Sequence, residues 1–162
     1  MKKTLNVLGL LTMLCVFSAG AKADPDSDPM YKSAADIQAG LPKNVDGKLV
    51  VDRIVSGAQI QVMAARAVHQ VGGTEMHRAI DVFYYVQAGH ADVLVGTRVE
   101  GGKYTTPDEW SGGKIVDGHT YSLSAGDILL MPAGSAHQVS VPKGGSFTYI
   151  VFRHASAKAA EK

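Results

Sequence analysis

The chain has 162 residues, of which 19% are charged and 46% are hydrophobic, and its formal net charge is +1 at pH 7. This length suits one domain with a sizeable core, and the even charge balance, without a basic patch, argues against a nucleic-acid-binding protein. The single cysteine is Cys15, close to the N-terminus. An internal disulfide is therefore excluded, and so is a thiolate site further along the chain.

Residues 1–23 have the pattern of a signal peptide that directs export. Lys2-Lys3 is a short basic start, Leu5–Phe17 is a largely apolar run, and Ala21-Lys22-Ala23 is a small-x-small cleavage site. The run is shorter than the roughly 20 apolar residues that span a bilayer. We expect the mature chain to begin at Asp24, in the periplasm or outside the cell, with no membrane contact after cleavage.

Residues 24–47 are predicted to form a leader with one short helix. The first part of this leader, Asp24–Pro29, contains only Asp, Pro and Ser and is expected to be flexible. Ser33 is a good N-cap for a helix over Ala34–Leu41, and Pro42 ends that helix.

From residue 48 to residue 154 the sequence changes to short β-type runs separated by turn residues. Glycine, proline and asparagine mark the turns, and runs at this spacing are typical of an all-β sandwich or barrel. The predicted strands are Leu49–Ile54, Gln59–Val68, Thr74–His77, Val82–Gln87, Ala91–Val95, Thr120–Leu123, Asp127–Met131, His137–Val141 and Ser146–Arg153. We assign one β domain to residues 48–154 and a short tail to residues 155–162.

One stretch, Gly96–Gly118, is too long for a hairpin connection. It is rich in glycine and contains Tyr104, Glu109 and Trp110. We call it the excursion and predict little regular structure there. It is either plain surface or a cover whose Glu109 and Trp110 close over the mouth of the domain and bind its ligand.

The clearest motif runs from Gly126 to His137, with the sequence GDILLMPAGSAH. Gly126 turns the chain into a strand, Pro132 and Gly134 make a tight bend, and the next strand begins with His137. The bend places this imidazole where it can point inward. The segment resembles the second motif of the cupin superfamily, G-x5-P-x-G-x2-H, at every spaced position, although Val141 stands where the family motif ends in asparagine.

A second group of polar residues lies earlier, in the segment Glu75-Met-His77-Arg-Ala-Ile-Asp81. It resembles the first cupin motif, H-x-H-x3-4-E-x6-G, with three departures. Glu75 replaces the first histidine, Asp81 replaces the glutamate, and the gap from Asp81 to Gly89 is longer by one residue. Successive side chains of a strand alternate between its faces, so Glu75 and His77 are expected on the same face.

The resemblance covers residues 48–153 and implies an all-β fold: a single double-stranded β-helix (jelly-roll) barrel, preceded by the short helix. It also implies a divalent metal ion inside the barrel, with His77, Asp81 and His137 as ligands. Asp81 can instead cap the turn before the next strand, and Glu75 is either a further ligand or a catalytic general base. A mixed nitrogen and oxygen donor set of this kind suits Fe(II), Mn(II), Zn(II) or Ni(II).

The expected ligand of the barrel is a small organic molecule. Tyr84 and Tyr85 point to opposite faces, so one of them lines the cavity, and we assign Tyr85 to substrate binding together with Glu109 and Trp110. Metal-dependent chemistry, in a dioxygenase, isomerase or lyase, is one function of such a site. The alternatives are a non-catalytic binding or sensing cupin and a structural cupin without metal. Apolar strands such as Ala91–Val95 also predict a homodimer.

Overall fold

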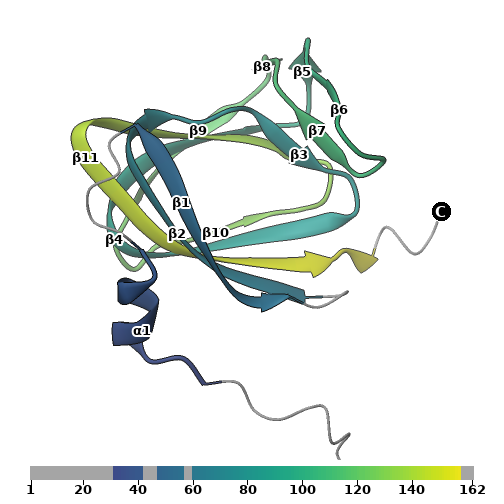
Figure 1. Cartoon of the computed structure of the whole chain (residues 1–162). Coiled ribbons are helices and arrows are strands. Elements are labelled where there is room, and N and C mark those ends of the chain that lie inside the picture. Colours follow the sequence, from purple (N-terminus) through teal and green to yellow (C-terminus); the bar gives the residue numbers. More distant parts are fainter. Residues whose placement is uncertain (1–30, 42–46, 57–59, 158–162) are drawn as a thin grey trace, which may run out of the picture. The chain divides into compact units, whose positions relative to one another are not determined.

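The computed structural model describes residues 31–41, 47–56 and 60–157 (Figure 1). The expected signal peptide, residues 1–23, lies outside the described residues, as do the flexible start of the expected leader and the end of the tail. Within the described ranges, no helix is both long and apolar enough to span a membrane.

One short helix, α1 (Ala34–Ala39), precedes the strands. The Ser33 hydroxyl accepts a hydrogen bond of 3.1 Å from the backbone N–H of Asp36, and the Asp36 carboxylate accepts one of 3.3 Å from the backbone N–H of Ser33. This reciprocal capping box confirms Ser33 as the N-cap. The helix ends at Ala39 and not at Leu41, because the chain leaves it at Gly40 and buries Leu41 in a small apolar cluster on the sheet.

The rest of the described chain is built of antiparallel strands. They are β1 (Lys48–Ser56), β2 (Ile60–Val71), β3 (Glu75–His77), β4 (Ile80–Gly96), β5 (Val99–Glu100), β6 (Lys103–Tyr104), β7 (Glu109–Ser111), β8 (Lys114–Ile115), β9 (His119–Ser124), β10 (Ile128–Met131) and β11 (Ala136–Ala155). One sheet follows the path β1-β2-β11-β3-β7-β6, and β4 joins it by pairing with β9, β10 and β11. Figure 1 shows these strands curling round into a barrel, which confirms the all-β prediction.

Two strands are longer than predicted because they continue through bends that we assigned as turns. β4 runs through Gly89, which has a φ of +78°, and β11 runs through residues 142–145. A side chain at Gly89 would collide with the carbonyl oxygen of Ser146, so only glycine permits this close approach of the two backbones. The register between β4 and β11 shifts between Ser140 and Phe147. The two strands therefore bend together and stay paired on both sides of the bend.

The excursion, residues 96–118, is more regular than predicted. It forms four short strands, of which β7 joins the main sheet by pairing with β3. In this pairing Glu109 lies opposite His77, and Trp110 lies opposite Met76. The turns use glycines in the left-handed region, which such residues adopt without strain; these are Gly101, Gly102, Gly112 and Gly113. The excursion is therefore attached to the strand that carries the first motif.

The interior of the barrel is largely apolar, because alternate residues of each strand point inward. On β4, Tyr84 and Val86 are buried, whereas Tyr85 on the opposite face is exposed. Val93 is also fully buried in this core. The Val93 face of Ala91–Val95, which we expected at a dimer contact, is therefore an interior face.

Candidate metal site and cavity

Side chains with metal-binding atoms meet where β3 pairs with β11. In the register of this pair, Glu75 lies opposite His137 and Met76 lies opposite Ala136. His77 follows Glu75 by two residues and therefore points to the same face of β3. Strand pairing thus brings together the two motifs, which are far apart in the sequence.

The three side chains are close enough to share one ion. One ligand atom from each of Glu75, His77 and His137 lies within 4.8 Å of the other two. The rings of His77 and His137 are 5.5 Å apart at their centroids, and the two residues are only 2% and 4% exposed. Two imidazoles and one carboxylate can hold a divalent transition metal. The donor set therefore fits the ion that the two motifs imply.

The protonation state of both histidines favours metal binding. Burial, together with the charges of Arg153 and His137, lowers the pKa of His77 from 6.5 to about 4. Burial also lowers the pKa of His137. Both rings are therefore neutral at pH 7, and each keeps one nitrogen lone pair that can bind an ion.

The tight bend of the second motif positions His137. Gly134 has a φ of +86°, and its N–H donates a hydrogen bond of 2.8 Å to the carbonyl oxygen of His77. The Ser135 N–H donates to the carbonyl oxygen of Pro132 at 3.0 Å. The bend is thus tied to β3 before β11 begins, as the motif spacing predicts, and His137 follows inside the barrel.

The structure does not bring Asp81 into the metal-binding group, so our assignment of Asp81 as a ligand needs correction. Its Oδ1 accepts a hydrogen bond of 2.8 Å from the backbone N–H of Ala133, in the same bend. This is the capping role that we considered as the alternative. The carboxylate of the group belongs to Glu75.

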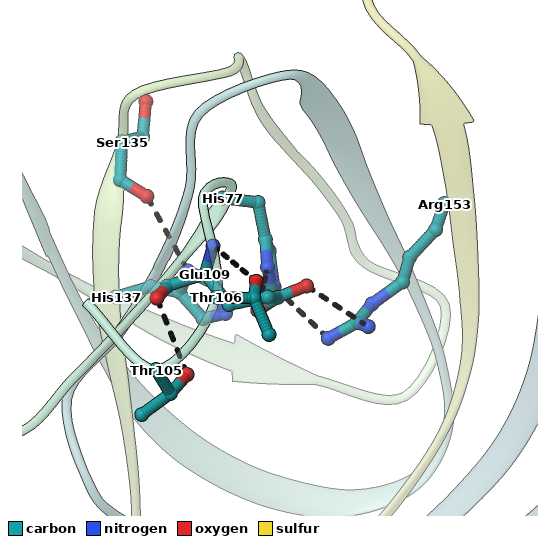
Figure 2. A network of polar contacts seen from close by, with 7 residues as sticks. All are labelled: His77, Thr105, Thr106, Glu109, Ser135, His137 and Arg153. Atoms are coloured by element: carbon teal, nitrogen blue, oxygen red, sulfur yellow. Dashed lines mark hydrogen bonds and ion pairs between the residues drawn. The ribbon is translucent and has the colours of Figure 1, made fainter.

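A second carboxylate, that of Glu109 in the excursion, lies beside His77. Glu109 Oε2 lies 2.6 Å from His77 Nδ1, and Arg153 Nη2 lies 2.9 Å from His77 Nε2 (Figure 2). Because arginine is only a donor, His77 Nε2 accepts this hydrogen bond and Nδ1 carries the proton of the ring; the Glu109 carboxylate lies close to Nδ1 but outside hydrogen-bond geometry. A metal ion at Nε2 would therefore take the place that the Arg153 guanidinium occupies.

Two threonines hold Glu109 in this position. The carbonyl oxygen of Glu109 accepts from the Thr105 N–H at 2.8 Å and from the Thr105 hydroxyl at 3.2 Å, and the Glu109 N–H donates to the Thr106 hydroxyl at 3.1 Å. Figure 2 shows this turn beside His77 and Arg153. A carboxylate held against the outer nitrogen of a metal-binding histidine fixes its orientation and tautomer.

The site opens into a cavity of about 240 Å³ inside the barrel. Its lining includes Glu75 and His137 and is completed by Leu49, Val51, Arg53, Met63, Ala65, Val82, Tyr84, Tyr149, Val151 and Arg153. A second cavity, of about 180 Å³, shares Glu75 and His137 with it and extends towards Gln70 and Val139. We call these cavities the first lobe and the second lobe.

The other substrate-binding assignments are changed by this geometry. Tyr84, and not Tyr85, lines both lobes, because Tyr85 points to the outer face. Trp110 packs edge-on against Tyr104 and donates a hydrogen bond to the carbonyl oxygen of Gly112. Glu109 contacts His77 from the excursion and does not line either lobe.

We did not predict from the sequence that two arginines line the first lobe. Leu49, Val51 and Arg53 alternate along β1, and the apolar members of this series mark the inner face. Arg153 continues the same kind of series on β11, after Tyr149 and Val151. Extending each inward-facing series by one step would have found both residues.

The comparisons with known proteins identify the fold. No family model matches the chain, and no curated protein matches it. A protein with a double-stranded β-helix domain from Klebsiella pneumoniae aligns at a TM-score of 0.56 with 14% identity, over 80% of this chain and 93% of that one.

Two further solved structures with a similar fold are cupins. A cupin superfamily protein from Desulfitobacterium hafniense aligns at a TM-score of 0.50 with 15% identity, over 73% of this chain and 87% of that one. The Cnp3 cupin domain of Schizosaccharomyces pombe aligns at 0.52 with 7% identity, over 74% of this chain and 73% of that one. At such identities the likeness concerns the fold, and it confirms the predicted barrel architecture.

Proposed function

We propose that this protein, a cupin-type double-stranded β-helix, binds one divalent metal ion through Glu75, His77 and His137. In this proposal the ion faces a small organic molecule in the adjoining cavity, which the protein binds or transforms. The observation that supports it most is the convergence of three ligand atoms within 4.8 Å, two of them from residues that line that cavity, Glu75 and His137.

The chemistry of the donor set favours a transition metal. Neutral imidazoles and a carboxylate suit Fe(II), Mn(II), Zn(II) or Ni(II) better than Ca(II) or Mg(II), which prefer oxygen ligands. A bound ion with an open coordination position would polarise a carbonyl group or bind oxygen. This chemistry covers the dioxygenases, isomerases and lyases expected above.

The remaining polar groups of the cavity would position the ligand. Burial raises the pKa of both Tyr84 and Tyr149, so their hydroxyl groups stay protonated and can donate hydrogen bonds. Glu75 would serve as the carboxylate ligand in place of Asp81, and at an ion that leaves it unbound it would act as a base.

A second candidate function is a barrel that binds its ligand without a metal. It is favoured by the position of Arg153, whose guanidinium already lies 2.9 Å from His77 Nε2. In that case an arginine takes the place of the ion, and the protein binds or senses a small molecule without turnover.

Elemental analysis of the mature protein, purified from its native compartment without a metal-binding tag, distinguishes these functions. We expect about one transition-metal ion per chain, reduced at least about tenfold in His137→Ala and Glu75→Gln, because each removes one ligand. Asp81→Asn is the matched control and should keep its metal. A wild-type protein that neither contains nor takes up a transition metal would leave only the second function.

We also propose that the protein is exported, on the strength of the N-terminal sequence pattern. Mass spectrometry of the protein from the periplasm or the medium should show a chain that begins at Asp24. A chain that still begins at Met1, or one lipidated at Cys15, would contradict this proposal.

A further inference from the structure

The first lobe of the cavity has more positive than negative side chains in its lining. Its charged lining residues are Arg53, Arg153 and Glu75. The second lobe shares Glu75 and is otherwise lined by uncharged residues and His137, which is neutral. Both arginines of the cavity therefore lie at one end, and the other end has no basic side chain.

Arg53 reaches the first lobe from the inner face of β1. It pairs in register with Met63, which is buried in the core and lines the same lobe. Among the described residues, Arg53 makes no hydrogen bond or ion pair within the chain, and it is exposed. No described residue neutralises the charge of Arg53, so this charge is available to a ligand in the cavity.

Arg153 reaches the same lobe from the end of β11. Its Nη2 donates to His77 Nε2, while Nη1 lies 4.0 Å from Glu109 Oε1. Its Nε is buried and has no hydrogen-bond partner. Glu109 is itself in contact with His77, so Arg153 is only partly neutralised.

The two arginines are placed to act on one ligand. Met63 pairs with Arg53 on one side and with Val151 on the other, and Arg153 follows Val151 by two residues on the same face. Strands lie about 4.8 Å apart and rise about 3.3 Å per residue, so two strand spacings and an offset of two residues separate the backbones of the two arginines by roughly 12 Å. Two extended arginine side chains span that distance towards a common anion.

We propose that the ligand of this cavity is a small organic carboxylate, held at its charged end by Arg53 and Arg153. Arginine binds carboxylates through paired, parallel N–H donors, and this geometry selects them over neutral groups. The rest of the ligand extends past Glu75 and His137 into the second lobe, which contains no arginine. The inference rests on the proposed function, because it places the ligand beside the ion that those residues would hold.

The volume of the cavity limits this carboxylate to a small molecule. The lobes measure about 240 Å³ and 180 Å³, so that together they lie near the lower end of the usual range of roughly 300–1,000 Å³ for sites of drug-sized ligands. Short-chain dicarboxylates are suitable probes, because one carboxylate can reach the arginines while the other end lies near the ion.

Calorimetric titration of the folded mature protein with malonate, succinate and glutarate tests the proposal. We expect at least one of the three to bind, and succinamide, the neutral analogue of succinate, to bind at least about tenfold more weakly. Arg53→Ala should weaken dicarboxylate binding by about ten- to a hundredfold, because a hydrogen bond to a charged group is lost. Arg53→Lys should recover only part of it.

Arg98→Ala is the matched control, since Arg98 is an exposed arginine of the excursion that lines neither lobe. Its dicarboxylate binding should equal that of the wild type. The proposal is overturned if no dicarboxylate binds, if succinamide binds as well as succinate, or if Arg53→Ala leaves binding unchanged. It is also overturned if inorganic phosphate binds as tightly as the dicarboxylates, because the arginines would then form a general anion site.

The same titrations, carried out with chelator-treated and with Mn(II)-loaded protein, separate this proposal from the metal site. Arg53→Ala should keep the wild-type metal content, because Arg53 is not a ligand. Carboxylate binding that depends on Arg53, in a protein that takes up no Mn(II), would support the carboxylate site and contradict the metal-based function. Metal binding without carboxylate binding would do the reverse.

Discussion

The carboxylate of Asp81 and the backbone N–H of Ala133 meet at 2.8 Å in the bend that precedes His137. Asp81→Ala should lower the free energy of unfolding by about 1–2 kcal/mol, since it leaves this backbone donor without its acceptor. Asp81→Asn should be nearly neutral, because its amide oxygen can accept the same hydrogen bond. Urea unfolding of the three proteins measures the difference. Equal stabilities of Asp81→Ala and the wild type would show that water replaces the cap.

The buried phenols of Tyr84 and Tyr149 should make the barrel sensitive to high pH. Burial raises the pKa of each above its usual value of 10.0. The unfolded chain loses these protons above pH 10 while the folded chain keeps them, so stability falls as pH rises through 10, by about 1.4 kcal/mol per pH unit for each phenol.

Absorbance at 295 nm, where tyrosinate absorbs, checks this prediction. The chain has six tyrosines, and we expect two of them to ionise only when the protein unfolds. Tyr149→Phe should remove one of the two delayed ionisations. Ionisation of all tyrosines near pH 10 in a folded protein would contradict the burial of this pair.

The short strand β7 should affect the affinity of the proposed metal site through Glu109, although it supplies no ligand. Glu109→Gln removes the charge 2.6 Å from His77 Nδ1, and we expect it to weaken metal binding by about 10- to 100-fold. Competition with a chromophoric chelator measures the affinity. Glu100→Gln, in β5 of the same excursion, should have no effect, and equal affinities for the two variants would argue against this role of β7.

The sequence predicted the helix and the strands well wherever local turn chemistry determines where an element begins or ends. Ser33 was identified as an N-cap, and the spacing of Pro132, Gly134 and His137 predicted the bend that carries the histidine. The breaks at Gly89 and at residues 142–145 were wrong, because glycine can bend a strand that stays paired with a distant neighbour. Nothing local distinguishes such a bend from a turn.

For the candidate site, too, local spacing predicted some residues, whereas others depend on contacts between distant parts of the chain. The strand period placed Glu75 and His77 on one face, and the motif spacing pointed to His137. The choice between Asp81 and Glu75 depended on whether the Ala133 amide needed an acceptor, which is a contact made across the fold. The pairing of β7 with β3 is likewise a tertiary contact that no spacing in the excursion reveals.

The whole molecule presents an apolar patch on the outside of the barrel, and we predict that a second copy of the chain covers it. The patch spans three adjacent strands, and its exposed members are Tyr85 on β4, Ile128 and Leu130 on β10, and Phe152 on β11. Ile128 pairs in register with Tyr85, while Leu130 and Phe152 both pair with Phe83, so these side chains are neighbours. Adjacent apolar side chains on an outer face are typical of an interaction surface.

Light scattering at micromolar concentration should therefore show a dimer. Leu130→Lys should shift it to the monomer, because it buries a charge in the contact. Val71→Lys, which changes an exposed apolar residue at the end of β2, should leave the dimer intact. A wild-type protein that is a monomer under these conditions would contradict the prediction.

The three-residue strand β3 also has a consequence for how the protein is made. Glu75 and His77 leave the ribosome well before His137, and β3 is too short to persist without its partners β7 and β11. Pairings between distant segments form late, because closing the intervening loop is entropically unfavourable. A metal ion bound by these residues would therefore enter a finished barrel and not guide its assembly, in contrast to zinc fingers, whose folding the metal drives. A chain that ends before Ala136 would carry two of the three donors and no β11 to complete the set.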